Sequence, residues 1–145
     1  MGSRTTLAQA EDCIRRREPF AVSATHYMRE STGVRFSFQG LLRPDARTVG
    51  DCGLLPLHCA RELVEHMLEY PGAVRYLVLS YETPIAWELE SGGAVCMPPY
   101  RYSPTTNSHQ GIAARALGVG KWDSWDKLPV RIPGKAPGWQ DRERG

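Results

Sequence analysis

Three short β-patterned runs between residues 74 and 97 constrain the fold more than any other part of the sequence. Residues 74–81 are apolar at almost every position, which is typical of a central strand covered on both faces. Residues 85–89 alternate apolar and polar side chains, so we expect a strand with one face in water. On that face Glu88 and Glu90 are expected to be solvated charges.

The end of this β-patterned region is marked by glycine and proline. Ser91, Gly92 and Gly93 predict a hairpin turn, because glycine reaches positive φ without cost. Residues 94–97 are then a short partner strand. Pairing is expected to end at Pro98 and Pro99, since proline donates no ladder hydrogen bond.

Segments with helical periodicity lie before and after the β-patterned runs. Thr5 or Thr6 is expected to cap a helix over residues 7–17, which ends before Pro19. A second helix is amphipathic and ends at Pro71-Gly72; its predicted apolar stripe is Ala60, Leu63, Val64, Met67 and Leu68. A third runs through residue 117, with Gly118 as its C-terminal cap.

Two further strands precede the second helix, one weak over residues 20–28 and one in which Val34, Phe36 and Phe38 alternate with polar residues. Residues 30–33 supply turn chemistry between them, and residues 40–56 are expected to be irregular. This mixed order predicts an α+β fold: an antiparallel sheet of about five strands with helices packed mainly on one face.

The chain of 145 residues fits one domain. We expect that domain over residues 1–120, followed by a Trp/Pro-rich C-terminal extension over residues 121–145 that is partly docked. Trp122 and Trp125 are the expected docking residues, and the end beyond Gly138 is expected to fray.

Composition and motif searches exclude several functional classes. The net charge of +2 is too small to indicate nucleic-acid binding by itself. No apolar run approaches the ~20 residues of a membrane helix, and we expect no secretory signal. Walker-type glycine loops, dinucleotide fingerprints, HExxH and paired metal carboxylates are all missing from the sequence. We therefore expect no cofactor and no membrane partner.

The cysteines are predicted to be reduced and structural. Cys13, Cys52, Cys59 and Cys96 are far apart and form no CxxC pair. A looser set, in which Cys52 and Cys59 join His58 and His66, matches no usual zinc spacing. His66 is interpreted as a histidine at the edge of the apolar stripe, and the sequence predicts no metal site.

The candidate site is the segment from residue 100 to residue 110, which leads into the third helix. It has more polar groups than helix capping requires, and two interpretations remain open. In the structural one, hydroxyls cap the helix while the tyrosines pack beside Trp87. In the functional one, the helix N-terminus, the hydroxyls, an arginine and a histidine converge on an anion such as phosphate. The candidate binding residues are Tyr100, Arg101, Tyr102, Ser103, Thr105, Thr106, His109 and Gln110.

A catalytic interpretation of the same segment is also open. Tyr102, Thr105 or Thr106 would act with His109 as base, in a hydrolase or a phosphoryl-group enzyme. No particular carboxylate is marked to orient that histidine. Whether the chain is an enzyme is therefore left undecided.

Two motifs resemble a pair found in small proteins of actinobacterial phages and mobile elements. Ser80, Tyr81 and residues 83–87 fit S-Y-x-T-P-I-A-W. The second motif, Y-S-x-T-T-x-x-H-Q, is fitted by Tyr102, Ser103, Thr105, Thr106, His109 and Gln110. The match covers about a quarter of the chain. It implies a phage, prophage or plasmid origin in a high-GC bacterium and a cytoplasmic setting, and it implies no reaction.

Together these observations favour a small phage- or mobile-element-type binding protein that acts in regulation or host takeover. Its expected partner is a nucleic acid or a host protein. Exposed aromatic residues near Arg101, namely Tyr100, Tyr102, Trp122 and Trp125, are the basis for considering nucleic acid. The alternatives are the enzyme above and a homo-oligomeric accessory component; the oligomeric state is left open.

Overall fold

A computed structural model describes residues 6–23, 36–100 and 102–119. In chain order the elements are α1 (Leu7–Arg16), β1 (Phe20–Ser23), β2 (Phe36–Leu42), η2 (Val49–Asp51), α2 (Leu57–Glu69), β3 (Val74–Ser80), β4 (Thr83–Leu89), β5 (Val95–Cys96) and α3 (Pro104–Leu117). The predicted turn over residues 30–33, Arg101, Trp122, Trp125 and the extension over residues 121–145 lie outside the described residues.

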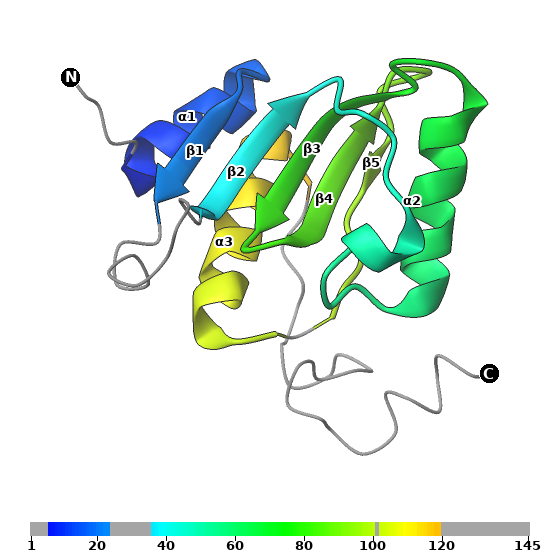
Figure 1. The fold of residues 1–145 in the computed structure, drawn as a ribbon. Helices are drawn as coiled ribbons and strands as arrows, with labels where there is room; N and C mark the ends of the chain where they lie inside the picture. The colour runs from blue at the N-terminus through cyan, green and yellow to red at the C-terminus, as the bar shows by residue number, and fades with distance from the viewer. Residues whose placement is uncertain (1–5, 24–35, 101, 120–145) are drawn as a thin grey trace.

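The five strands form one antiparallel sheet in the order β1-β2-β3-β4-β5, which confirms the predicted α+β class. Figure 1 shows α1 and α3 together behind the sheet, and α2 beside β4 and β5. Two of the three helices thus share one face. None of the helices in the described ranges is long and apolar enough to cross a membrane.

Alternate side chains of β3 face two separate apolar clusters, as the period of a strand requires. Leu77 and Leu79 pack with α2 residues such as Leu63, together with Trp87, Tyr100 and Tyr102. Tyr76 and Val78 pack instead with residues of α1 and α3, including Ile14 and Ala113. Burial of β3 on both faces, as predicted, follows from its place between these clusters.

The ends of the helices follow local chemistry. Thr6 accepts from the Gln9 backbone N–H, and the Gln9 side chain accepts from the Thr6 N–H, so α1 begins with a complete capping box. Gly118 adopts the left-handed conformation after α3, with φ of 78°. The hairpin turn before β5 likewise uses positive φ at Gly92 and Gly93.

The prediction of a wet face on β4 is wrong, because six of its seven residues are buried. Glu88 lies within the sheet and is held by two arginines. Arg17 donates from Nε to Oε1 at 2.9 Å and from Nη2 to Oε2 at 2.8 Å, and Arg75 Nε donates to Oε1 at 3.1 Å. Glu90 is exposed as predicted and pairs with Arg43 at 3.3 Å.

Strand β2 continues to Leu42, three residues into the segment that was predicted to be irregular. Gly40 does not break the strand; it makes room for its neighbours. A Cβ at this position would collide with the Tyr76 hydroxyl and the Phe20 ring. That hydroxyl crosses above Gly40 and donates to the Glu18 carbonyl at 2.6 Å.

Candidate functional site

A buried cluster of two hydroxyls and one imidazole lies where the end of β3 meets the first turns of α3. The Ser80 hydroxyl is 2.9 Å from Thr106 Oγ1 and 2.8 Å from His109 Nδ1. All three side chains are buried, and His109 is 3% exposed. Ser80 therefore joins the sheet to α3 by hydrogen bonds, and it was not among the predicted site residues.

Aromatic rings fix the orientation of His109. Its imidazole stacks on Phe38, with ring centroids 4.1 Å apart and an interplanar angle of 4°. The Tyr81 ring lies 6.4 Å away, on a residue whose φ of 54° is uncommon for an aromatic side chain. Burial lowers the pKa of His109 from 6.5 to about 4. The imidazole is therefore neutral at pH 7 and does not supply a positive charge for an anion.

The next residue along α3 connects the helix to the preceding segment. Gln110 is completely buried, and its Nε2 donates to the Tyr100 carbonyl at 3.0 Å. The Tyr100 hydroxyl is 2.9 Å from His58 Nε2 at the start of α2. Tyr100 and Tyr102 also belong to the apolar cluster that contains Trp87, as the structural interpretation predicted.

The N-terminus of α3 is capped by its own residues. Ser103 Oγ accepts from the Thr106 N–H at 3.2 Å, the Ser103 carbonyl accepts from the Asn107 N–H at 2.8 Å, and Pro104 has no N–H. Asn107 Oδ1 accepts from the Tyr102 N–H at 3.0 Å. An anion at this position would have to displace the Ser103 cap.

The structure thus divides the predicted binding residues by accessibility. Five of them are buried: Tyr100, Tyr102, Thr106, His109 and Gln110. Ser103 is half-buried and Thr105 is exposed. The Ser80 hydroxyl contacts both Thr106 and His109, so the cluster joins α3 to the sheet. Reaction at His109 would require α3 to move away from Phe38.

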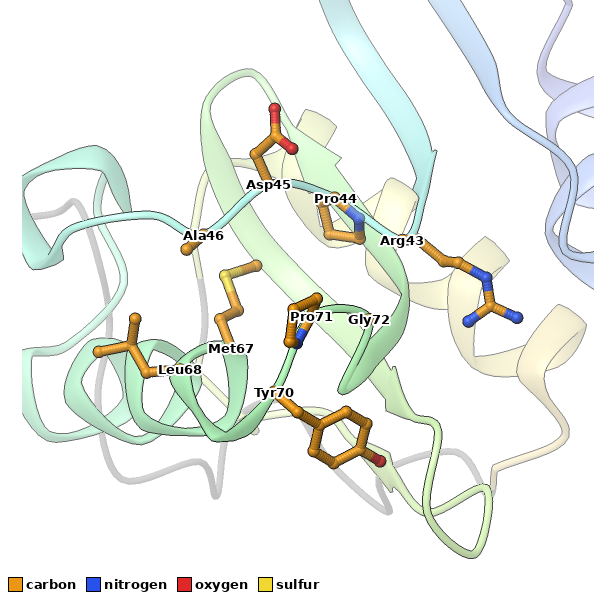
Figure 2. A pocket seen from close by; sticks show the side chains of 9 residues that line it. All are labelled: Arg43, Pro44, Asp45, Ala46, Met67, Leu68, Tyr70, Pro71 and Gly72. Carbon is orange, nitrogen blue, oxygen red and sulfur yellow. The ribbon is translucent and has the colours of Figure 1, made fainter.

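An open groove lies elsewhere, between the C-terminal end of α2 and the segment after β2. It has a volume of about 590 Å³ and is lined on one side by Met67, Leu68 and Tyr70 and on the other by residues 43–46. Figure 2 shows Met67 pointing from α2 toward Ala46. A smaller hollow of about 330 Å³ lies beside the same segment, so the backbone of residues 44–46 borders two hollows.

Sequence reasoning missed this groove. Leu68 was assigned to the buried stripe of α2, and that assignment is wrong, because it is 68% exposed. Tyr70 is 42% exposed at the end of the same helix. Helical spacing places Leu68 next to the stripe but does not reveal where the covered face of α2 ends. The signal available in the sequence was a leucine and a tyrosine shortly before Pro71, where the helix was predicted to end.

The groove is lined by charges of both signs, and its cations already have partners. Arg43 pairs with Glu90, and Arg47 Nη1, in the adjoining hollow, donates to the Asp51 carbonyl at 2.7 Å. Asp45 adds a carboxylate to the lining. The nearby exposed face of α2 carries Glu65 and Glu69. With Arg43 and Asp45 in the lining, these glutamates make the surroundings of the groove on the α2 side acidic.

Comparisons with protein-family models, with curated proteins and with solved structures gave no match.

Proposed function

We propose that this chain is a small binding protein of phage or mobile-element type that acts in regulation or host takeover by binding a host protein. The observation that carries the proposal is the open groove beside the exposed Leu68 and Tyr70. Tyrosine, methionine and arginine, all present in the lining, are enriched at protein interfaces.

The charge around the groove supports a protein partner over a nucleic acid. Asp45, Glu65 and Glu69 would repel phosphates, whereas a lysine or arginine on a partner would be attracted to them. We infer that the occupant is an extended apolar segment of the partner with an adjacent basic residue. Its apolar side chains would cover Leu68 and the basic residue would face Asp45.

The enzymatic alternative has less support. Thr106 and His109 are buried, and Ser80, the hydroxyl nearest to His109, is buried with them. Nucleophilic catalysis needs a nucleophile that substrate can reach. Tyr102, Thr105, Thr106 and His109 therefore remain a weaker proposal for a hydrolase or phosphoryl-group enzyme.

Site-specific photo-crosslinking in an actinobacterial host tests the proposal. A photoreactive phenylalanine analogue at position 68 should yield a discrete protein adduct that can be identified by mass spectrometry. The matched control places the analogue at Leu7, which is exposed on α1, far from the groove in the fold. The identified partner is then purified, and its affinity should fall at least 10-fold with Leu68→Asp, because the complex would bury an unpaired carboxylate in an apolar contact.

Nucleic-acid binding is the competing outcome. Fluorescence anisotropy with single- and double-stranded DNA and with RNA, at low and physiological salt, measures it directly. The proposal would be contradicted by two results together: nucleic-acid binding that depends strongly on salt and is unchanged in Leu68→Asp, and no protein adduct specific to position 68.

A further inference from the structure

Helix α2 and the edge strand β5 bring together three side chains of metal-binding type, and this site is independent of the groove. Glu62 and His66 are four residues apart, so they lie on one face of α2. Cys96 lies on β5. One ligand atom from each of the three lies within 4.8 Å of the others. Of the loose set considered from the sequence, only His66 belongs to this group.

A buried atom without a partner points to a ligand here. The Nδ1 atom of His66 is buried and has no hydrogen-bond partner among the described residues. Burial removes the hydrogen bond of such an atom to water, and an unsatisfied buried polar atom destabilises the folded state. A neutral imidazole has one acceptor nitrogen, which a hydrogen-bond donor or a metal ion can use, and the described residues supply no donor here.

Trp87 supplies a second contact to the group from inside the sheet. It pairs with Cys96 across β4 and β5, so the two side chains are neighbours on one face. The indole Nε1 of Trp87 is buried and has no hydrogen-bond partner among the described residues. A Cys96 thiolate bound to a metal ion would offer this N–H an acceptor, as the outer contacts of metal sites do.

We propose that Glu62, His66 and Cys96 form a zinc-binding site that joins α2 to β5. Thiolate, imidazole and carboxylate are the three donor types that Zn²⁺ uses. Bonds of about 2.0 to 2.3 Å in a tetrahedron separate the ligand atoms by roughly 3.5 Å. The three atoms need to approach by about 1 Å at most, and Glu62 is exposed, so its side chain has room to rotate toward the other two. Water completes the fourth position.

The place of the site in the fold gives the ion a structural role. Strand β5 pairs with β4 through only two residues, Val95 and Cys96. A metal bond from Cys96 to a helix would hold this short edge strand against the domain. Because the ion binds the folded chain, it should raise the melting temperature as its concentration rises.

Cobalt(II), a spectroscopic substitute for zinc, tests the site in the reduced full-length chain. We expect one equivalent to bind, with a thiolate-to-cobalt charge-transfer band and tetrahedral visible bands, and Zn²⁺ to displace it. Cys96→Ser should abolish the charge-transfer band, and the control Cys13→Ser should retain it. Cys13 is on α1, away from the site.

Two variants of exposed glutamates test the site without altering a buried side chain. Glu62→Gln should weaken zinc binding at least 10-fold in a competition titration, and Glu65→Gln should leave it unchanged. Both positions are exposed on α2, so circular dichroism should show both variants folded. The proposal is overturned if no thiolate band forms, if the band survives Cys96→Ser, or if the two carboxylate variants bind zinc equally.

Discussion

The ion pair between Arg17 and Glu88 predicts a large and asymmetric effect on stability. In Arg17→Met the aliphatic stem is kept and both hydrogen bonds to the carboxylate are lost. Glu88, 5% exposed in its side chain, then keeps Arg75 as its one partner among the described residues. Removing one member of a buried pair costs about 3–5 kcal/mol. Because Arg75 remains and the Arg17 side chain is 27% exposed, we expect about 2–3 kcal/mol.

Urea denaturation followed by circular dichroism measures this loss. With a slope of about 1–3 kcal/mol per molar urea, the midpoint should fall by roughly 0.7–3 M. The control is Arg16→Met, one residue earlier, where the side chain is 60% exposed and pairs with Asp12 on the surface. Surface pairs contribute about 0–1 kcal/mol, so its midpoint should hardly change.

The pH dependence of the stability loss in Arg17→Met distinguishes the lost ion pair with Glu88 from a loss of side-chain packing. Hydrogen bonds from Arg17 keep the pKa of Glu88 below its usual value of 4.5. The ionised carboxylate therefore stabilises the folded state above pH 4.5, and this contribution is lost as the pH falls through the lowered pKa. The difference between wild type and Arg17→Met should narrow below pH 4.5. Equal losses for Arg17→Met and Arg16→Met would refute the reasoning.

Two further predictions concern α3. The pKa of His109 is about 4 in the folded chain and 6.5 in the unfolded chain, so the unfolded chain binds more protons between these pH values. The free energy of unfolding should therefore fall by up to about 3 kcal/mol as the pH drops from 6.5 to 4. Urea titrations of His109→Gln should lack this dependence on pH. Gly111→Ala should raise stability by about 0.5–1 kcal/mol in thermal melts, because its Cβ would meet nothing within 4 Å. A slope retained in His109→Gln, or a lower melting temperature for Gly111→Ala, would contradict these accounts.

Features decided by nearby residues were predictable from the sequence. The Thr6 cap, the hairpin turn at Gly92 and Gly93, and the Gly118 cap depend on contacts within a few residues. Burial of β3 on both faces was evident from its continuous apolar run. These elements, taken in order, were sufficient to predict an antiparallel sheet with helices.

Features decided by distant residues were not predictable. Glu88 alternates with apolar residues like any surface carboxylate, and its partner Arg17 is 71 positions away. The polar excess between residues 100 and 110 was visible, but a single sequence does not show that Ser80 and Phe38 enclose His109. The same holds for Cys96, whose neighbours His66 and Glu62 come from another element.

The passage of the Tyr76 hydroxyl above Gly40 links three positions that are far apart in the sequence. Any methyl group at position 40 must be matched by a smaller side chain at 76 and at 20, so these sites can vary only in concert. An alanine fixed there without such compensation would push the Tyr76 hydroxyl away from the Glu18 carbonyl and break the bond that ties the end of α1 to β3.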